Sequence, residues 1–194
     1  FNAGRSIKWL RDDLGLISSA REVDVLAESV PDAGGAYFVS AFTGLGAPHW
    51  DMYARGAMLG LTRATTKAHF ARAVLEGIAY QVRDLAETME KDAGVPLAEL
   101  KVDGGASVSN IMMQIQADLL GTRVNRPKCV ESTALGAACL AGLATGVFSS
   151  TQDIATQWES EHTFEPQIDR QEREKRLVGW RKALSRAMDW EARE

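Results

Sequence analysis

The pattern of apolar and polar positions is clearest in two segments, residues 67–91 and residues 107–120. In both, apolar side chains recur every three or four positions with polar residues between them, which predicts amphipathic helices. The stripes that we expect to face the core consist of Phe70, Val74, Ile78, Leu85 and Met89 in the first helix, and of Val108, Ile111, Met112, Ile115 and Leu119 in the second.

Shorter periodic segments predict further helices at residues 6–14, 21–29, 132–145 and 149–158. The segment 132–145 is rich in Ala and Gly on several faces, so we expect it to pack tightly. A tail from Gln167 to Trp190 is charged at first and amphipathic later. Its expected buried stripe is Leu177, Trp180, Leu184 and Met188, and its expected packing anchors are Trp158, Trp180 and Trp190.

Short β-prone runs alternate with these helices, at residues 36–42, 57–61, 100–102 and 122–124. A glycine-rich loop, residues 43–51, follows the first run. Strands that alternate with helices are typical of an α/β layer. The chain has 194 residues and neither an internal repeat nor a linker, which suits one domain with an appended tail.

Composition narrows the function classes. The chain is 45% hydrophobic and 25% charged, as in an ordinary globular protein. Its net charge of -4 argues against a nucleic-acid-binding surface, and no apolar run is long enough to insert into a membrane. Cys129 and Cys139 belong to no set with metal-ligand spacing, so we expect two free thiols and a reducing, cytoplasmic setting.

The beginning of the sequence also leads to an expectation. The chain starts at Phe1 without a methionine, and its first nine residues already have the pattern of a helix entry. We therefore expect this sequence to be part of a larger protein.

The strongest local chemical signal lies at residues 100–110, which read Leu-Lys-Val-Asp-Gly-Gly-Ala-Ser-Val-Ser-Asn. A predicted strand leads into two glycines, and a predicted helix follows. Glycine allows a sharp turn and close approach of a ligand, and the free N–H groups of a helix start suit phosphate oxygens. Ser107 or Ser109 can instead cap the helix, and a plain turn is the more frequent outcome of such a pattern. The spacing matches neither the Walker loop nor the dinucleotide fingerprint.

These residues belong to a wider resemblance that covers nearly the whole chain. The segments 103–106, 113–114, 117–121, 133–138 and 141–142, together with Asn110, resemble a C-terminal signature of the FGGY carbohydrate kinases. Within that family, the segments 42–48, 50–51, 54–56 and 60–63 are similar to those of the members that phosphorylate glycerol.

The resemblance implies an α/β domain of the ribonuclease H-like class, as in actin, hexokinase and Hsp70, with a mixed sheet flanked by helices. Residues 1–194 would form the C-terminal nucleotide-binding domain, with residues 149–194 as a helical tail packed on it. An N-terminal substrate domain, absent here, would complete an enzyme that transfers the γ-phosphoryl group of Mg-ATP to glycerol, giving sn-glycerol 3-phosphate. Such enzymes commonly form dimers or tetramers.

The resemblance also assigns site residues. Gly4, Ile7 and Lys8 would line the nucleotide pocket, with Lys8 where many relatives carry Gln. Gly105 would face the nucleotide with its backbone, and Ser109, where Asn is common, or Asn110 would contact it. It assigns no catalytic residue and no metal ligand to this chain, because those are expected upstream, so we expect the chain alone to be inactive. The alternatives are the C-terminal half of another FGGY sugar or polyol kinase, or a non-catalytic interaction module.

Four further polar positions have two interpretations each. Arg55 and Arg63 can reach phosphate or, more often, pin loops. His49 can contact substrate or belong to the structure of its loop. Glu172 lies in a segment, residues 166–174, that resembles the surface where some bacterial members meet a sugar-transport regulator, at the position of a shared metal ligand. The alternative is a solvated helix entry.

Overall fold

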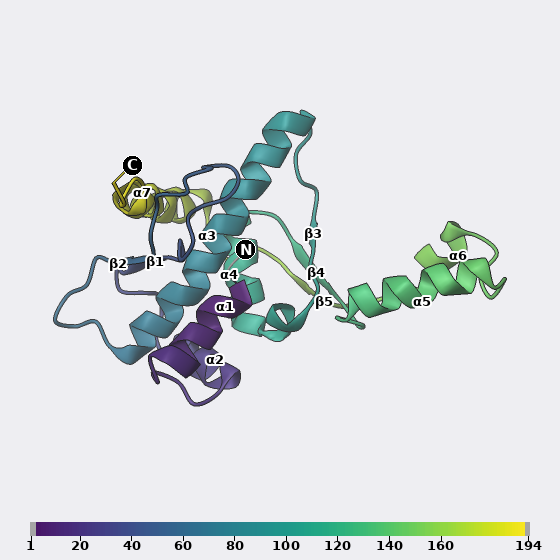
Figure 1. Cartoon of the computed structure of the whole chain (residues 1–194), viewed down its shortest axis with the longest axis horizontal. Coiled ribbons are helices and arrows are strands. Elements are labelled where there is room, and N and C mark those ends of the chain that lie inside the picture. The colour runs from purple at the N-terminus through teal and green to yellow at the C-terminus, as the bar shows by residue number, and fades with distance from the viewer. Residues whose placement is uncertain (1–2, 193–194) are drawn as a thin grey trace.

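A long helix, α3 (Lys67–Ala93), is the central element of the computed structural model, which describes residues 3–192 (Figure 1). Its middle, from Ala73 to Tyr80, is buried continuously beneath three other elements. These are α2 (Ala20–Glu28), α4 (Asn110–Leu120) and the strand β1 (Tyr37–Val39). At Gly77 a side chain is excluded, because a Cβ there would lie 2.2 Å from the Phe38 carbonyl oxygen.

The two predicted N-terminal helices are confirmed. The first is α1 (Ala3–Lys8), which continues into a π-helical turn over Trp9–Asp13. The second, α2, begins after Ser19, whose hydroxyl accepts a hydrogen bond from the Glu22 amide. Such a cap satisfies one of the free N–H groups at a helix start.

Two small sheets accompany the helices. β1 pairs antiparallel with β2 (Ala57–Leu59). The second sheet is mixed: β3 (Leu100–Lys101) runs parallel to β4 (Val124–Pro127), and β4 runs antiparallel to β5 (Ser160–Phe164). α4 connects β3 to β4, which is the usual way to join parallel strands. The expected α/β class is confirmed, although the sequence pattern gave no sign of β5.

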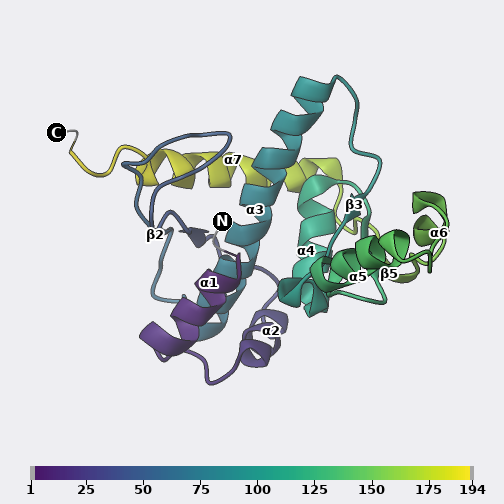
Figure 2. The ribbon, with the colours of Figure 1, turned by 45° about the vertical axis from the view of Figure 1, so that its right-hand side comes forward.

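The C-terminal helix α7 (Arg170–Ala187) crosses the back of α3 (Figure 2). Trp180 is buried, stacks on Tyr80 with ring centroids 5.0 Å apart, and donates a hydrogen bond from Nε1 to Asp84 at 2.7 Å. Leu177 and Leu184 are buried as predicted, and Met188 is half-buried. The other two tryptophans of the predicted tail, Trp158 and Trp190, are 38% and 69% exposed, so the prediction that they anchor the tail was wrong.

Three positions predicted to face the core do not. Leu85 and Met89 are exposed, because α3 beyond Tyr80 extends past the elements that cover its middle (Figure 1). Val108 is exposed because the predicted helix 107–120 is interrupted at its start. A 3-10 turn, η2 (Gly105–Val108), comes first, and the α-helix begins only at Asn110.

The helix α5 (Ser132–Ala144) contradicts the expectation of tight packing. With the short α6 (Thr151–Ala155) it projects from the body of the molecule (Figures 1 and 2). Only Cys139 and Gly142 of α5 are buried, and Gly142 lies against the ring of Phe148, which follows the helix. Small side chains permit close packing but do not ensure it, since a neighbouring element must be present. Among residues 3–192, no helix is long and apolar enough to cross a membrane.

Candidate functional site

The turn between β3 and α4, residues 104–109, is the centre of the predicted site. Gly104 has a φ of 76°, a left-handed conformation that favours glycine. Gly105 then begins η2, and Ser109 precedes α4. The first N–H groups of such a turn have no partner within it, so they are available to a ligand.

Contacts from both sides hold this turn in place. The Gly104 amide donates to the Val130 carbonyl at 2.7 Å, and the Ser107 hydroxyl donates to the Gly104 carbonyl at 2.7 Å. Behind the turn, Nη1 of Arg126 donates to the Ser107 carbonyl at 2.8 Å. Arg126 was not among the predicted site residues. It lies beyond the predicted strand 122–124, and only the structure extends that strand to Pro127 and buries it.

Ser109 is a buried capping residue. Its hydroxyl accepts a hydrogen bond from the Met112 amide at 3.1 Å and donates one to the Asp24 carboxylate at 2.7 Å. Asp24 comes from α2, and its burial raises the pKa of its carboxyl, an effect that the hydrogen bond from Ser109 opposes. Asn110 is exposed at the start of α4. Of Ser109 and Asn110, the two residues predicted to contact the nucleotide, Asn110 therefore has the more accessible side chain.

The structure places α1 beside this turn. Gly4 and Lys8 are exposed on α1, and Ile7 is half-buried. A Cβ placed on either Gly4 or Gly105 would have no other atom within 4 Å, so both glycines border open space. The predicted site residues thus gather on two neighbouring elements with room for a ligand against the backbone.

The glycine-rich loop, residues 43–51, forms a different feature. Leu45 and Asp51 exchange two backbone hydrogen bonds, and the loop covers a hollow of about 160 Å³ beside Ile78 and Gln81 of α3. His49 lies 3.4 Å from Asp84, the residue that also accepts from Trp180. This contact joins the loop to α3 and favours the structural interpretation of His49.

Arg55 pins the chain that follows this loop. Its Nη1 donates to the carbonyl oxygens of Met52 and Ala54, at 2.9 and 2.7 Å, and its Nε pairs with Glu191 at 3.0 Å. All three contacts lie within the chain, so the structure favours loop pinning over phosphate binding. Arg63 is exposed.

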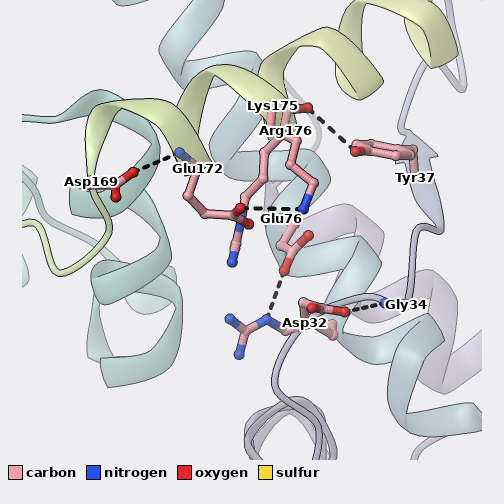
Figure 3. Close-up of polar contacts among 9 residues, drawn as sticks. Asp32, Gly34, Tyr37, Glu76, Asp169, Glu172, Lys175 and Arg176 are labelled. Atoms are coloured by element: carbon pink, nitrogen blue, oxygen red, sulfur yellow. Dashed lines mark hydrogen bonds and ion pairs between the residues drawn. The ribbon is translucent and has the colours of Figure 1, made fainter.

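A second hollow, of about 180 Å³, lies beside the start of α7 (Figure 3). Glu76 is buried in it and accepts a hydrogen bond from Arg72 at 2.9 Å; its burial raises the pKa of the carboxyl. Glu172 pairs with Arg176 at 2.8 Å, and this hydrogen bond lowers the pKa of Glu172. Among residues 3–192, no group of three or more His, Cys, Asp and Glu side chains is placed to hold a metal ion.

Together, the mixed sheet, the left-handed glycine and the capped helix define an α/β domain with a turn suited to phosphate-bearing ligands. The chain belongs to the FGGY family of carbohydrate kinases, since the model of that family's C-terminal domain matches residues 1–145. The small mixed sheet with surrounding helices is consistent with the ribonuclease H-like class that the resemblance implied.

The chain is also similar to individual carbohydrate kinases, in sequence and in structure. The chain is 56% identical to a glycerol kinase from Deinococcus radiodurans over 191 residues, which is 98% of this chain and 38% of that protein. Among solved structures it matches Plasmodium falciparum glycerol kinase with ADP, at a TM-score of 0.86 and 34% identity. It also matches ligand-bound xylulose kinase from Lactobacillus acidophilus, at a TM-score of 0.72 and 26% identity. These matches cover 95% of this chain and, respectively, 37% and 36% of those chains.

Proposed function

We propose that this chain is the C-terminal, nucleotide-binding part of a glycerol kinase, an enzyme that transfers the γ-phosphoryl group of Mg-ATP to glycerol. The observation that carries the proposal is the 56% identity to a glycerol kinase over almost the entire chain. The structural similarity to a glycerol kinase with ADP supports the same reaction. The chain spans little more than a third of these relatives, so the complete activity requires a further part.

The proposed nucleotide contacts are Gly4, Ile7 and Lys8 on α1, and Gly105, Ser109 and Asn110 at the turn. Gly105 offers its backbone amide to phosphate oxygens without a side chain in the way. Lys8 supplies a positive charge and Asn110 an exposed amide side chain. Ser109 acts mainly through α4, because its hydroxyl already donates to Asp24 and accepts from Met112. Mg²⁺ would enter bound to ATP.

The catalytic base and the contacts to glycerol would come from the part that this chain does not span. Phosphoryl transfer needs a group that positions the nucleophile and a metal site, and neither is assigned to these residues. The chain alone is therefore proposed to be inactive, and the complete enzyme to be a dimer or tetramer. Because xylulose kinases share the fold, a different polyol or sugar is the alternative substrate.

Nucleotide binding is tested by titrating Mg-ADP into the chain and following its thermal midpoint. A ligand that binds only the folded state raises this midpoint. Gly105→Val should abolish the rise and leave the unliganded midpoint unchanged, because the new side chain enters open space in front of the turn. Gly136→Val is the matched control, since Gly136 on α5 also borders open space. A rise that both variants retain would contradict this site.

Phosphoryl transfer is tested by joining the chain to the remaining N-terminal part of the Deinococcus radiodurans glycerol kinase, which would supply the contacts to glycerol. This chimera should phosphorylate glycerol with ATP, whereas the chain alone should not. A folded chimera that binds Mg-ADP and does not phosphorylate glycerol would contradict the kinase proposal, provided that the natural Deinococcus enzyme phosphorylates glycerol in the same assay.

A further inference from the structure

Arg126 is a buried cation directly behind the proposed phosphate turn. It lies on β4, and only 9% of its side chain is exposed. A charge is rarely buried to this extent unless it is paired and hydrogen-bonded. The partners of Arg126 therefore indicate what its charge does.

Three partners from two elements, η2 and β5, fix the guanidinium group. Nη1 donates to the Ser107 carbonyl of η2 at 2.8 Å, and Nε donates to the Glu161 carboxylate of β5 at 2.5 Å. The group also lies 5.3 Å from the ring centroid of Phe164. The hydrogen bond from Arg126 lowers the pKa of Glu161, which keeps that carboxylate charged. The planar fork of arginine holds two acceptors at a fixed angle, which a lysine ammonium does not.

The Ser107 carbonyl is the point at which Arg126 holds the turn from β4. Ser107 is itself buried, and its hydroxyl holds the carbonyl of Gly104. A contact at Ser107 therefore fixes the peptide groups between Gly104 and Ser107 relative to β4. The amides of Gly105 and Ala106 lie in this segment, so the contact between Arg126 and Ser107 also determines the direction in which they point.

We propose that Arg126 is a positioning residue for the nucleotide: it holds the turn at residues 104–107 so that the amides of Gly105 and Ala106 point at the phosphates. This inference rests on the proposed nucleotide site. Arg126 does not touch the ligand and acts through the backbone of Ser107. Misplacement of a binding group by about 1 Å can change rates by about a hundred-fold, so such support is measurable.

The test compares Arg126→Lys with the parent, in the chain alone and in the chimera with the Deinococcus part. Lysine keeps the charge and the pairing with Glu161, but it cannot also hold Ser107 in the same geometry. We expect an about ten-fold weaker Kd for Mg-ADP by calorimetry, on the order of one lost charge-assisted hydrogen bond. In the chimera the KM for ATP should rise while the KM for glycerol stays unchanged. Amide hydrogen exchange at Ser107 and Ser109 should become faster.

Arg123→Lys is the matched control, because Arg123 lies just before β4, is half exposed and pairs with Glu99 at 3.4 Å. It should leave the affinity for Mg-ADP unchanged. If Arg126→Lys does not fold, Glu161→Gln decides, since Glu161 is exposed and the substitution replaces the charged acceptor of Nε of Arg126 with a neutral amide oxygen, which accepts a weaker hydrogen bond. That variant should weaken the Kd for Mg-ADP by about two- to three-fold.

The outcomes separate this inference from the function on which it rests. If the parent binds no Mg-ADP in either form, the proposed site fails, and the inference fails with it. If the parent binds and both Arg126→Lys and Glu161→Gln bind equally well, only the positioning role is overturned. A defect in Arg126→Lys that lowers the thermal midpoint and leaves the Kd and KM values unchanged would also overturn it, because that is the effect of a purely structural ion pair.

Discussion

At the scale of single residues, Ser109 has two roles: the resemblance implies that it contacts the nucleotide, and the structure shows that it also caps a helix. Its hydroxyl caps α4 and is bonded to Asp24, so its two hydrogen bonds join α2 to α4 beside the proposed site. Ser109 therefore affects stability through the helix cap and ligand binding through the proposed nucleotide contact, and substitutions can separate the two effects.

We predict that Ser109→Ala lowers the free energy of unfolding by about 1–2 kcal/mol, because a helix cap and a hydrogen bond to a half-buried carboxylate are both lost. Urea unfolding followed by circular dichroism measures the change. Ser109→Asn should retain most of the stability, since Asn also caps helices well, and should bind Mg-ADP at least as tightly as the parent. Equal stability of the Ala variant and the parent would show that the cap contributes nothing.

Most individual site residues could not have been found from the sequence pattern alone. The glycine pair after a strand predicted a turn, and the structure has a turn there, with Gly104 in the left-handed conformation. Assigning Gly4, Ile7 and Lys8 required the resemblance, because α1 meets the turn only in three dimensions. Arg126 and Asp24 stayed hidden, since nothing in a sequence shows which carbonyl or hydroxyl a distant charge will reach.

At the scale of elements, the packing of α3 against β1 depends on Gly77. The Phe38 carbonyl occupies the space that a side chain would need. This contact brings β1 close to the middle of α3. Sequence periodicity predicts which face of the helix is apolar, but it does not predict such a close approach.

Gly77→Ala should therefore destabilise the chain by about 3 kcal/mol, because backbone atoms of β1 must move to admit one methyl group. Gly136→Ala is the paired variant on α5, where the methyl meets open space. There the substitution should stabilise by about 0.5–1 kcal/mol through helix propensity. Thermal or urea unfolding of both variants gives the signs directly. Similar destabilisation by both would contradict the close contact at Phe38.

The helices were predictable as elements, and the errors concern their surroundings. Periodicity located α2, α3, α4 and α7, because each has one apolar face that the core covers. Periodicity failed for β5, because its five residues are exposed except Phe164 and so form no apolar face. Pairing with β4 makes this segment a strand. Periodicity also failed at Val108, where a 3-10 turn changes the phase of the helix.

At the scale of the whole molecule, α5 is the element that the rest of the chain leaves uncovered (Figures 1 and 2). It contains no charged residue, and its exposed side chains include Leu135 and Leu140. A helix that is apolar on all sides is normally buried. A second copy or another part of a longer polypeptide can cover such a surface, and for the chain by itself only the second copy is present.

We therefore predict that the chain alone self-associates through α5 and that Leu140→Lys weakens this association. Leu140 is 69% exposed, so lysine should change the free energy of unfolding by less than about 0.5 kcal/mol while its charge opposes burial. Sedimentation velocity over a concentration series should show a shift toward monomer. Val178→Lys on α7 is the matched control, because Val178 is 61% exposed and lies on a different element. If both variants weaken association equally, a lysine at any exposed apolar position has this effect, and the surface of α5 is not responsible. If only Leu140→Lys does, α5 is the self-association surface of the isolated chain.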